Sequence, residues 1–160
     1  MDNIITYFLG EKFQCTVGAM ISITFITISI YFLFQQKQFL KGIAYATIPL
    51  SILLFIICIT VIYKNSTDIE RVTTFYKDAP QKIHEVEIPR IQNVMKIFGI
   101  LKKVEIVIFL LGFVIVIAFW KNEMLRGVGV GLMIMGACLY TFDHLAESRS
   151  ELYMQFLKSF

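Results

Sequence analysis

The densest group of side chains that could do chemistry is Asp143, His144 and Glu147, close to the C-terminal end of the chain. Carboxylate oxygens and imidazole nitrogens are common metal ligands, and Asp143 and Glu147 are one helical turn apart. A metal ion held there would suit a membrane-bound enzyme that modifies lipids, which is one hypothesis for this protein. The simpler interpretation is a solvated helix face without metal.

The sequence contains no other catalytic pattern. Two histidines are present in all, the stretch 84–87 reads HEVE instead of HExxH, and no GxSxG motif occurs. The three cysteines, Cys15, Cys58 and Cys138, lie in apolar runs and form no CxxC pair. They suit helix packing better than redox or zinc chemistry. We therefore expect neither enzymatic activity nor a bound cofactor or metal.

Arg149 is the most suggestive single residue, because it interrupts an apolar and aromatic stripe near the C-terminus. An arginine on an apolar face is usually paired, and its guanidinium group can form two hydrogen bonds to one carboxylate. The candidate partners are Glu105, Asp143, Glu85 and Glu87. We predict a clasp between the C-terminal segment and the central segment of the chain. The alternative is a binding site for an anionic lipid or a cytoplasmic protein.

Glu105 is the carboxylate nearest to an apolar run, and Lys102 lies three residues before it. Residues at this spacing are neighbours on one helix. We predict an ion pair between Glu105 and Lys102 at the membrane interface, and a proton-coupled role for Glu105 is the alternative.

Small residues recur in the last apolar run, at Gly127, Gly131 and Gly136. Glycines four residues apart allow two helix backbones to approach closely. We predict that this face packs against a neighbouring helix. The alternative is the seam of a homo-oligomer, which is the form that a small transporter or channel would require.

The composition assigns these residues to a membrane protein. The chain has 160 residues, of which 57% are hydrophobic and 17% are charged, and its mean hydropathy is +0.70. Soluble domains are less apolar and more highly charged. The net charge is only +3, and charges of both signs are interspersed. The chain therefore lacks the basic patch that a nucleic-acid partner requires.

Four apolar runs are long enough to cross a bilayer core of about 30 Å as helices. They cover about 15–34, 42–63, 104–120 and 124–142. Eleven of the fifteen lysines and arginines flank these runs on the side that holds both termini and the segment 64–103. The positive-inside rule places that side in the cytoplasm. We therefore expect a protein of the cell (inner) membrane with both termini in the cytoplasm.

The segment 64–103 is predicted to form a cytoplasmic helical hairpin. Thr67 and Glu70 match a capping box that opens a helix, and Asp78-Ala79-Pro80 is expected to end it. A further amphipathic helix is expected over 143–160, lying either on the membrane surface or on the hairpin.

The predicted fold is thus an all-α integral membrane protein, a four-transmembrane-helix bundle that forms one domain over 1–160. The leading hypothesis is a non-catalytic protein that acts by contact with membrane lipids and with a protein partner at its cytoplasmic face. A scaffold, an accessory subunit or an immunity-type protein would fit this description.

Overall fold

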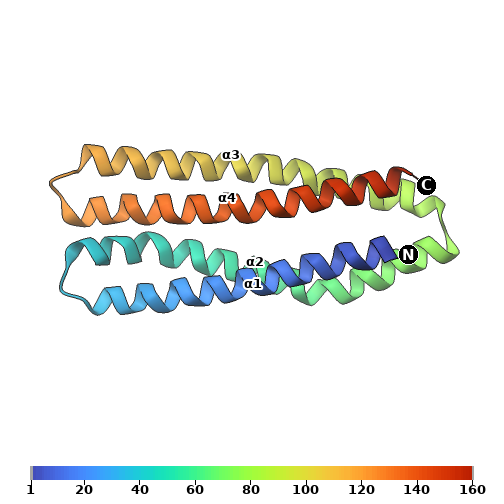
Figure 1. Cartoon of the computed structure of the whole chain (residues 1–160), viewed down its shortest axis with the longest axis horizontal. Coiled ribbons are helices and arrows are strands. Elements are labelled where there is room, and N and C mark those ends of the chain that lie inside the picture. Colours follow the sequence, from blue (N-terminus) through green and yellow to red (C-terminus); the bar gives the residue numbers. More distant parts are fainter. Residues whose placement is uncertain (1, 160) are drawn as a thin grey trace.

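The computed structural model describes residues 2–159, so Met1 and Phe160, the ends of the predicted domain, lie outside it. These residues form an elongated bundle of long antiparallel helices (Figure 1). The helices are α1 (Asp2–Phe34), α2 (Gln38–Asp78), α3 (Ile88–Ala118) and α4 (Glu123–Lys158), with a short π-helical turn, η1 (Ile83–Glu87), before α3. The all-helical class predicted from the sequence is confirmed.

The two ends of the bundle differ in what they contain. The short turns 35–37 and 119–122 lie together at one end (Figure 1). The opposite end holds the beginning of α1, the end of α4 and the turn 79–82. Asn122 begins α4 as its N-cap, because its side-chain oxygen accepts a hydrogen bond from the backbone N–H of Leu125 at 3.1 Å. We call the end that holds the turn 79–82 the polar end.

Three of the described helices are long and apolar enough to cross a membrane. They are α1 from Ile4 onward, α2 and α4. The last eighteen residues of α3 carry Lys102, Lys103 and Glu105, and α3 is not among the three. Large apolar side chains such as Leu53 and Val114 remain more than half exposed on the surface. Such a surface is typical of helices that face lipid, which supports the prediction of a membrane protein.

Helix packing divides the chain into two hairpins, α1 with α2 and α3 with α4, which are joined mainly through α2 and α4. The backbones of α2 and α4 meet at glycines. A Cβ atom on Gly127 would overlap the carbonyl oxygen of Phe39, and one on Gly42 would overlap that of Met124. Gly131 packs against Ile43. We call this contact the α2–α4 seam.

Two helix starts predicted from the sequence are wrong. Thr67 does not open a new helix, because α2 continues through it from Gln38 to Asp78. α2 is not interrupted before Thr67, so the backbone N–H groups that a capping box would satisfy already form hydrogen bonds within α2. Similarly, the segment after 142 is not a separate helix but the last part of α4.

The best-buried part of the core lies at the polar end. Its buried residues come from all four helices and from η1, and they are Ile4, Tyr7, Phe8, Val72, Ile83, Ile91, Tyr153, Met154 and Leu157. The C-terminal part of α4 therefore packs on the N-terminal part of α1 and on the region around the turn 79–82. A smaller core of Cys15, Ala19, Leu54 and Cys58 lies further along the rod.

Candidate functional site

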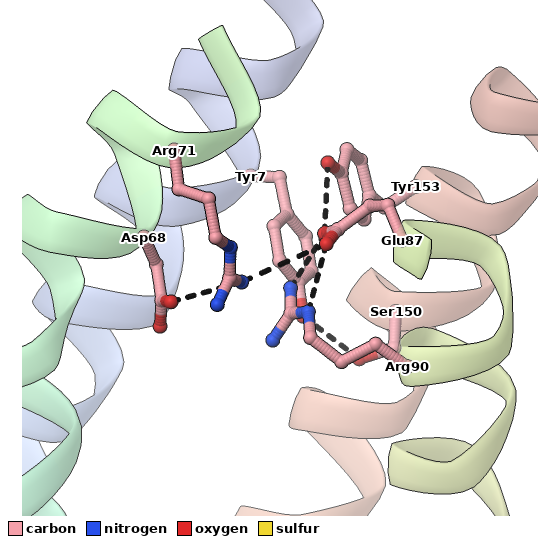
Figure 2. A network of polar contacts seen from close by, with 7 residues as sticks. All are labelled: Tyr7, Asp68, Arg71, Glu87, Arg90, Ser150 and Tyr153. Carbon is pink, nitrogen blue, oxygen red and sulfur yellow. Dashed lines mark hydrogen bonds and ion pairs between the residues drawn. The ribbon is translucent and has the colours of Figure 1, made fainter. Parts of the chain in front are cut away.

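Glu87, the last residue of η1, is the most deeply buried charged residue of the described chain, and its side chain has no solvent exposure. Arg90 lies one turn later on α3 and donates two hydrogen bonds to this carboxylate, Nε to Oε2 at 2.9 Å and Nη2 to Oε1 at 2.6 Å. The Tyr153 hydroxyl of α4 donates to Oε1 at 3.3 Å. Both carboxylate oxygens are therefore satisfied (Figure 2).

Arg71 brings α2 into the same cluster. Its Nη2 atom lies 3.7 Å from the Glu87 carboxylate and 2.9 Å from that of Asp68 (Figure 2). Burial disfavours the charged form of Arg90, but the hydrogen bonds and the charge of Glu87 outweigh it and raise the Arg90 pKa above its ordinary value. Glu87 and Arg90 thus form a charged pair that links η1 and α3 to α2 and α4.

Two tyrosines complete this cluster and join α1 to it. The rings of Tyr7 and Tyr153 stack with centroids 4.1 Å apart and an angle of 9° between their planes. The Tyr7 hydroxyl lies 3.4 Å from Ser150 Oγ. Tyr7, Asp68, Arg71, Glu87, Arg90, Ser150 and Tyr153 together are called the Glu87 cluster (Figure 2).

Arg149 pairs with a residue of α1, a helix that contains none of the predicted partners. Its Nη2 atom donates a hydrogen bond to Gln14 Oε1 at 2.7 Å, and Gln14 Nε2 donates to the backbone oxygen of Phe142 at 2.6 Å. Of the four carboxylates predicted as partners, Glu87 binds Arg90, Glu105 and Asp143 face each other, and Glu85 is exposed. The predicted clasp therefore connects α4 to α1 and not to the segment 64–103.

Glu105 does not pair with Lys102, so this prediction is wrong. Lys102 instead forms an ion pair with Glu147 of α4. Because α3 and α4 pack along their lengths, Lys102 reaches Glu147 on the neighbouring helix and does not bind Glu105 three residues away. Glu105 is left buried, and its carboxyl group faces that of Asp143.

The three residues considered as an alternative metal site do not converge. Glu147 is bound to Lys102, and the ring of His144 stacks on Tyr140 at 6.2 Å. Among the described residues, no three His, Cys, Asp or Glu side chains are grouped so that they could hold a metal ion. Asp143, His144 and Glu147 therefore do not form a three-ligand metal site.

The predicted small-residue face is covered within the chain. Gly127 and Gly131 lie in the α2–α4 seam, and Gly136 packs on α3, where an added Cβ would lie 3.1 Å from the backbone oxygen of Glu105. A second copy of the chain could not use this face unless the chain's own helices separated.

The charged groups of the polar end therefore hold helices together, with Glu87 as their common partner. No known family model, no curated protein and no solved structure matches this chain.

Proposed function

We propose that the protein crosses the membrane four times, with α3 as the fourth span. The segment Val104–Ala118 of α3 is apolar apart from Glu105, and it packs beside α4, which is itself able to cross. Lys102 and Lys103 come just before this segment and can extend to the headgroup region. The turns 35–37 and 119–122 lie at the same end of the rod (Figure 1), which suits four antiparallel crossings.

The length of the helices supports a body outside the membrane. At 1.5 Å per residue, the 41 residues of α2 extend about 62 Å and the 36 residues of α4 about 54 Å. The bilayer core takes up only about 30 Å. The apolar runs begin near the turns 35–37 and 119–122, so the excess length falls at the polar end.

The polar end is proposed to lie in the cytoplasm, because eleven of the fifteen basic residues belong to it. The Glu87 cluster and the apolar core around Tyr7 and Tyr153 make it a rigid body. Only the short turns would face the other side.

We infer that this rigid cytoplasmic body acts by contact with a protein partner, in a scaffold, accessory or immunity-type role without catalysis. The observation that carries the proposal is the body itself: four helices continue well past their apolar runs and are fastened together there. Its tip around the turn 79–82 exposes charged side chains of both signs, Lys77, Lys82 and Glu85 among them. A mixed-charge, ordered surface is suited to specific protein contact.

Photo-crosslinking in living cells tests this function. A photoreactive benzophenone side chain would replace Glu85 at the tip of the polar end or, as the matched control, Gln36 in the turn at the opposite end; both positions are exposed. We expect Glu85 to give a discrete adduct with a different protein and Gln36 to give none. Adducts at neither position, or the same adducts at both, would contradict the proposal.

A further inference from the structure

A cavity of about 190 Å³ lies inside the rod, where the helices pass from their apolar runs into the polar end. All four helices line it. Most of the wall is apolar, with Leu50, Leu54 and Ile57 of α2 and Phe98 and Leu101 of α3 among its members. The polar groups of the wall are Glu11 and Gln14 of α1, Glu105 of α3, and Asp143, Arg149 and Ser150 of α4, together with the Tyr7 hydroxyl.

Glu105 is the unsatisfied group of this cavity. Its side chain is buried, with 6% exposure for the residue, and its Oε2 atom accepts no hydrogen bond from any described residue. Lys102, the cation nearest to it along α3, is held by Glu147. Asp143 faces Glu105, but two carboxylates present only acceptors to each other unless one carries a proton. The side-chain hydrogen bond between Glu105 and Asp143 requires a proton on one of the two carboxyl groups, and Oε2 of Glu105 still lacks a donor. A cation placed between the two groups would neutralise both and would supply the missing donor.

The charge of the wall points the same way. Three carboxyl groups, Glu11, Glu105 and Asp143, share the cavity with one guanidinium group, that of Arg149. Arg149 also donates a hydrogen bond to Gln14. The cavity is therefore acidic overall, and a positively charged ligand would complement it.

An inorganic ion is a poor fit for this space. Among residues 2–159, no three His, Cys, Asp or Glu side chains are grouped closely enough to hold a metal ion. The cavity volume of about 190 Å³ is also larger than a single ion needs. A cavity of about 150 Å³ in another protein already holds a molecule of benzene. Apolar walls with a few polar groups are typical of sites for small organic molecules.

The cavity borders the surface that would face lipid. Leu53, Ile57 and Val104 contribute to its wall and are each about half exposed, on α2 and α3. A ligand with an apolar part could therefore enter from the membrane, provided that α3 spans it as proposed above. We propose that the cavity binds a small amphipathic amine, with its ammonium group at Glu105 and Asp143 and its apolar part against Leu54 and Ile57.

Binding to the purified protein in detergent tests this proposal independently of the contact function. The probes are three molecules of similar size and different charge: 2-phenylethylamine as the cation, 2-phenylethanol as the neutral molecule and 3-phenylpropionate as the anion. The readout is the dissociation constant from the ligand-dependent rise in the thermal unfolding midpoint. Glu105→Gln keeps the size of the side chain and removes its charge. Glu123→Gln makes the same change at an exposed position at the far end of α4.

We expect the amine to bind at least tenfold more tightly than the alcohol or the acid. Glu105→Gln should weaken amine binding at least tenfold, and Glu123→Gln should leave it unchanged. Equal binding of amine and alcohol to the unaltered chain would overturn the proposal without any variant. Amine binding that survives Glu105→Gln would overturn it as well. So would the absence of amine binding at concentrations of about 10 mM, or equal stabilisation of the protein by sodium or calcium ions.

Discussion

Glu87 shows why a charge can lie fully inside the polar end. A buried carboxylate is tolerated only where hydrogen bonds and opposite charges replace water. Arg90 supplies two hydrogen bonds and a positive charge, Tyr153 a third hydrogen bond, and Arg71 a second positive charge at 3.7 Å. Because these partners come from three helices, the carboxylate acts as a common anchor, and its loss would leave cations facing one another.

Replacing this anchor should destabilise the protein strongly. We expect Glu87→Ala to lower the free energy of unfolding by about 3 kcal/mol, near the lower end of the effect of breaking a buried ion pair, since Arg90 and Arg71 are partly exposed. Glu85→Ala, two residues earlier and exposed, should change it by no more than about 0.5 kcal/mol. Unfolding with sodium dodecyl sulfate in mixed micelles, followed by near-ultraviolet circular dichroism of the tyrosines, measures both. Equal losses in the two variants would refute the anchor role.

At the scale of residues, none of the side-chain pairs predicted from the sequence is the pair that forms: Lys102 binds Glu147 and not Glu105, and Arg149 binds Gln14. Glu87 and Arg90 stand three residues apart, so their pairing is the one that spacing along the sequence indicates. The bonds from Arg149 to Gln14 and from Lys102 to Glu147 join different helices. Such pairs depend on which helices are neighbours, and hydropathy does not specify that.

At the scale of helices, the α2–α4 seam is the main joint between the two hairpins. The backbones approach so closely at Gly42 and Gly127 that no side chain fits between them. In lipid, where no hydrophobic effect drives helices together, such close packing is a principal source of association. The seam thus stabilises the half of the rod that contains the apolar runs.

A pair of identical substitutions separates packing from helix propensity. Gly127→Ala adds a methyl group that overlaps the backbone of Phe39, so we expect a loss of about 1–3 kcal/mol in unfolding free energy. Gly99→Ala adds the same group on α3, where nothing lies within 4 Å of the added Cβ apart from the adjoining residues and backbone of α3 itself. It should stabilise the helix by about 0.5–1 kcal/mol. Thermal unfolding in detergent gives both values. A stabilising Gly127→Ala would show that the seam does not exist.

Hydropathy was sufficient to find the helices but not all of their ends. The apolar runs and the break at Asp78-Ala79-Pro80 correspond to real helices and to the real end of α2. The capping-box pattern at Thr67 failed because local patterns cannot show that a helix is already under way. The extensions of α2 and α4 past the apolar runs are stabilised by the core around Tyr7, Phe8 and Tyr153, which forms only when distant segments meet.

For the whole molecule, one long rod combines two surfaces. One half is apolar on the outside and suits lipid, and the other half is fastened by the Glu87 cluster and suits water. The proposal that the polar end stands in the cytoplasm, with four helices crossing the membrane, connects the cytoplasmic contact function with the amine-binding cavity near the interface. Both depend on the same topology.

Thiol labelling of single-cysteine chains tests this topology most directly. In a chain with Cys15, Cys58 and Cys138 changed to alanine, one cysteine would replace Glu85, Gln36 or Lys121, all of which are exposed. A membrane-impermeant maleimide should label Gln36→Cys and Lys121→Cys in intact cells, and Glu85→Cys only after the membrane is permeabilised. Labelling of Glu85→Cys in intact cells would show that the orientation is the opposite of the one proposed. Labelling of Gln36→Cys together with protection of Lys121→Cys would show that α3 does not cross the membrane.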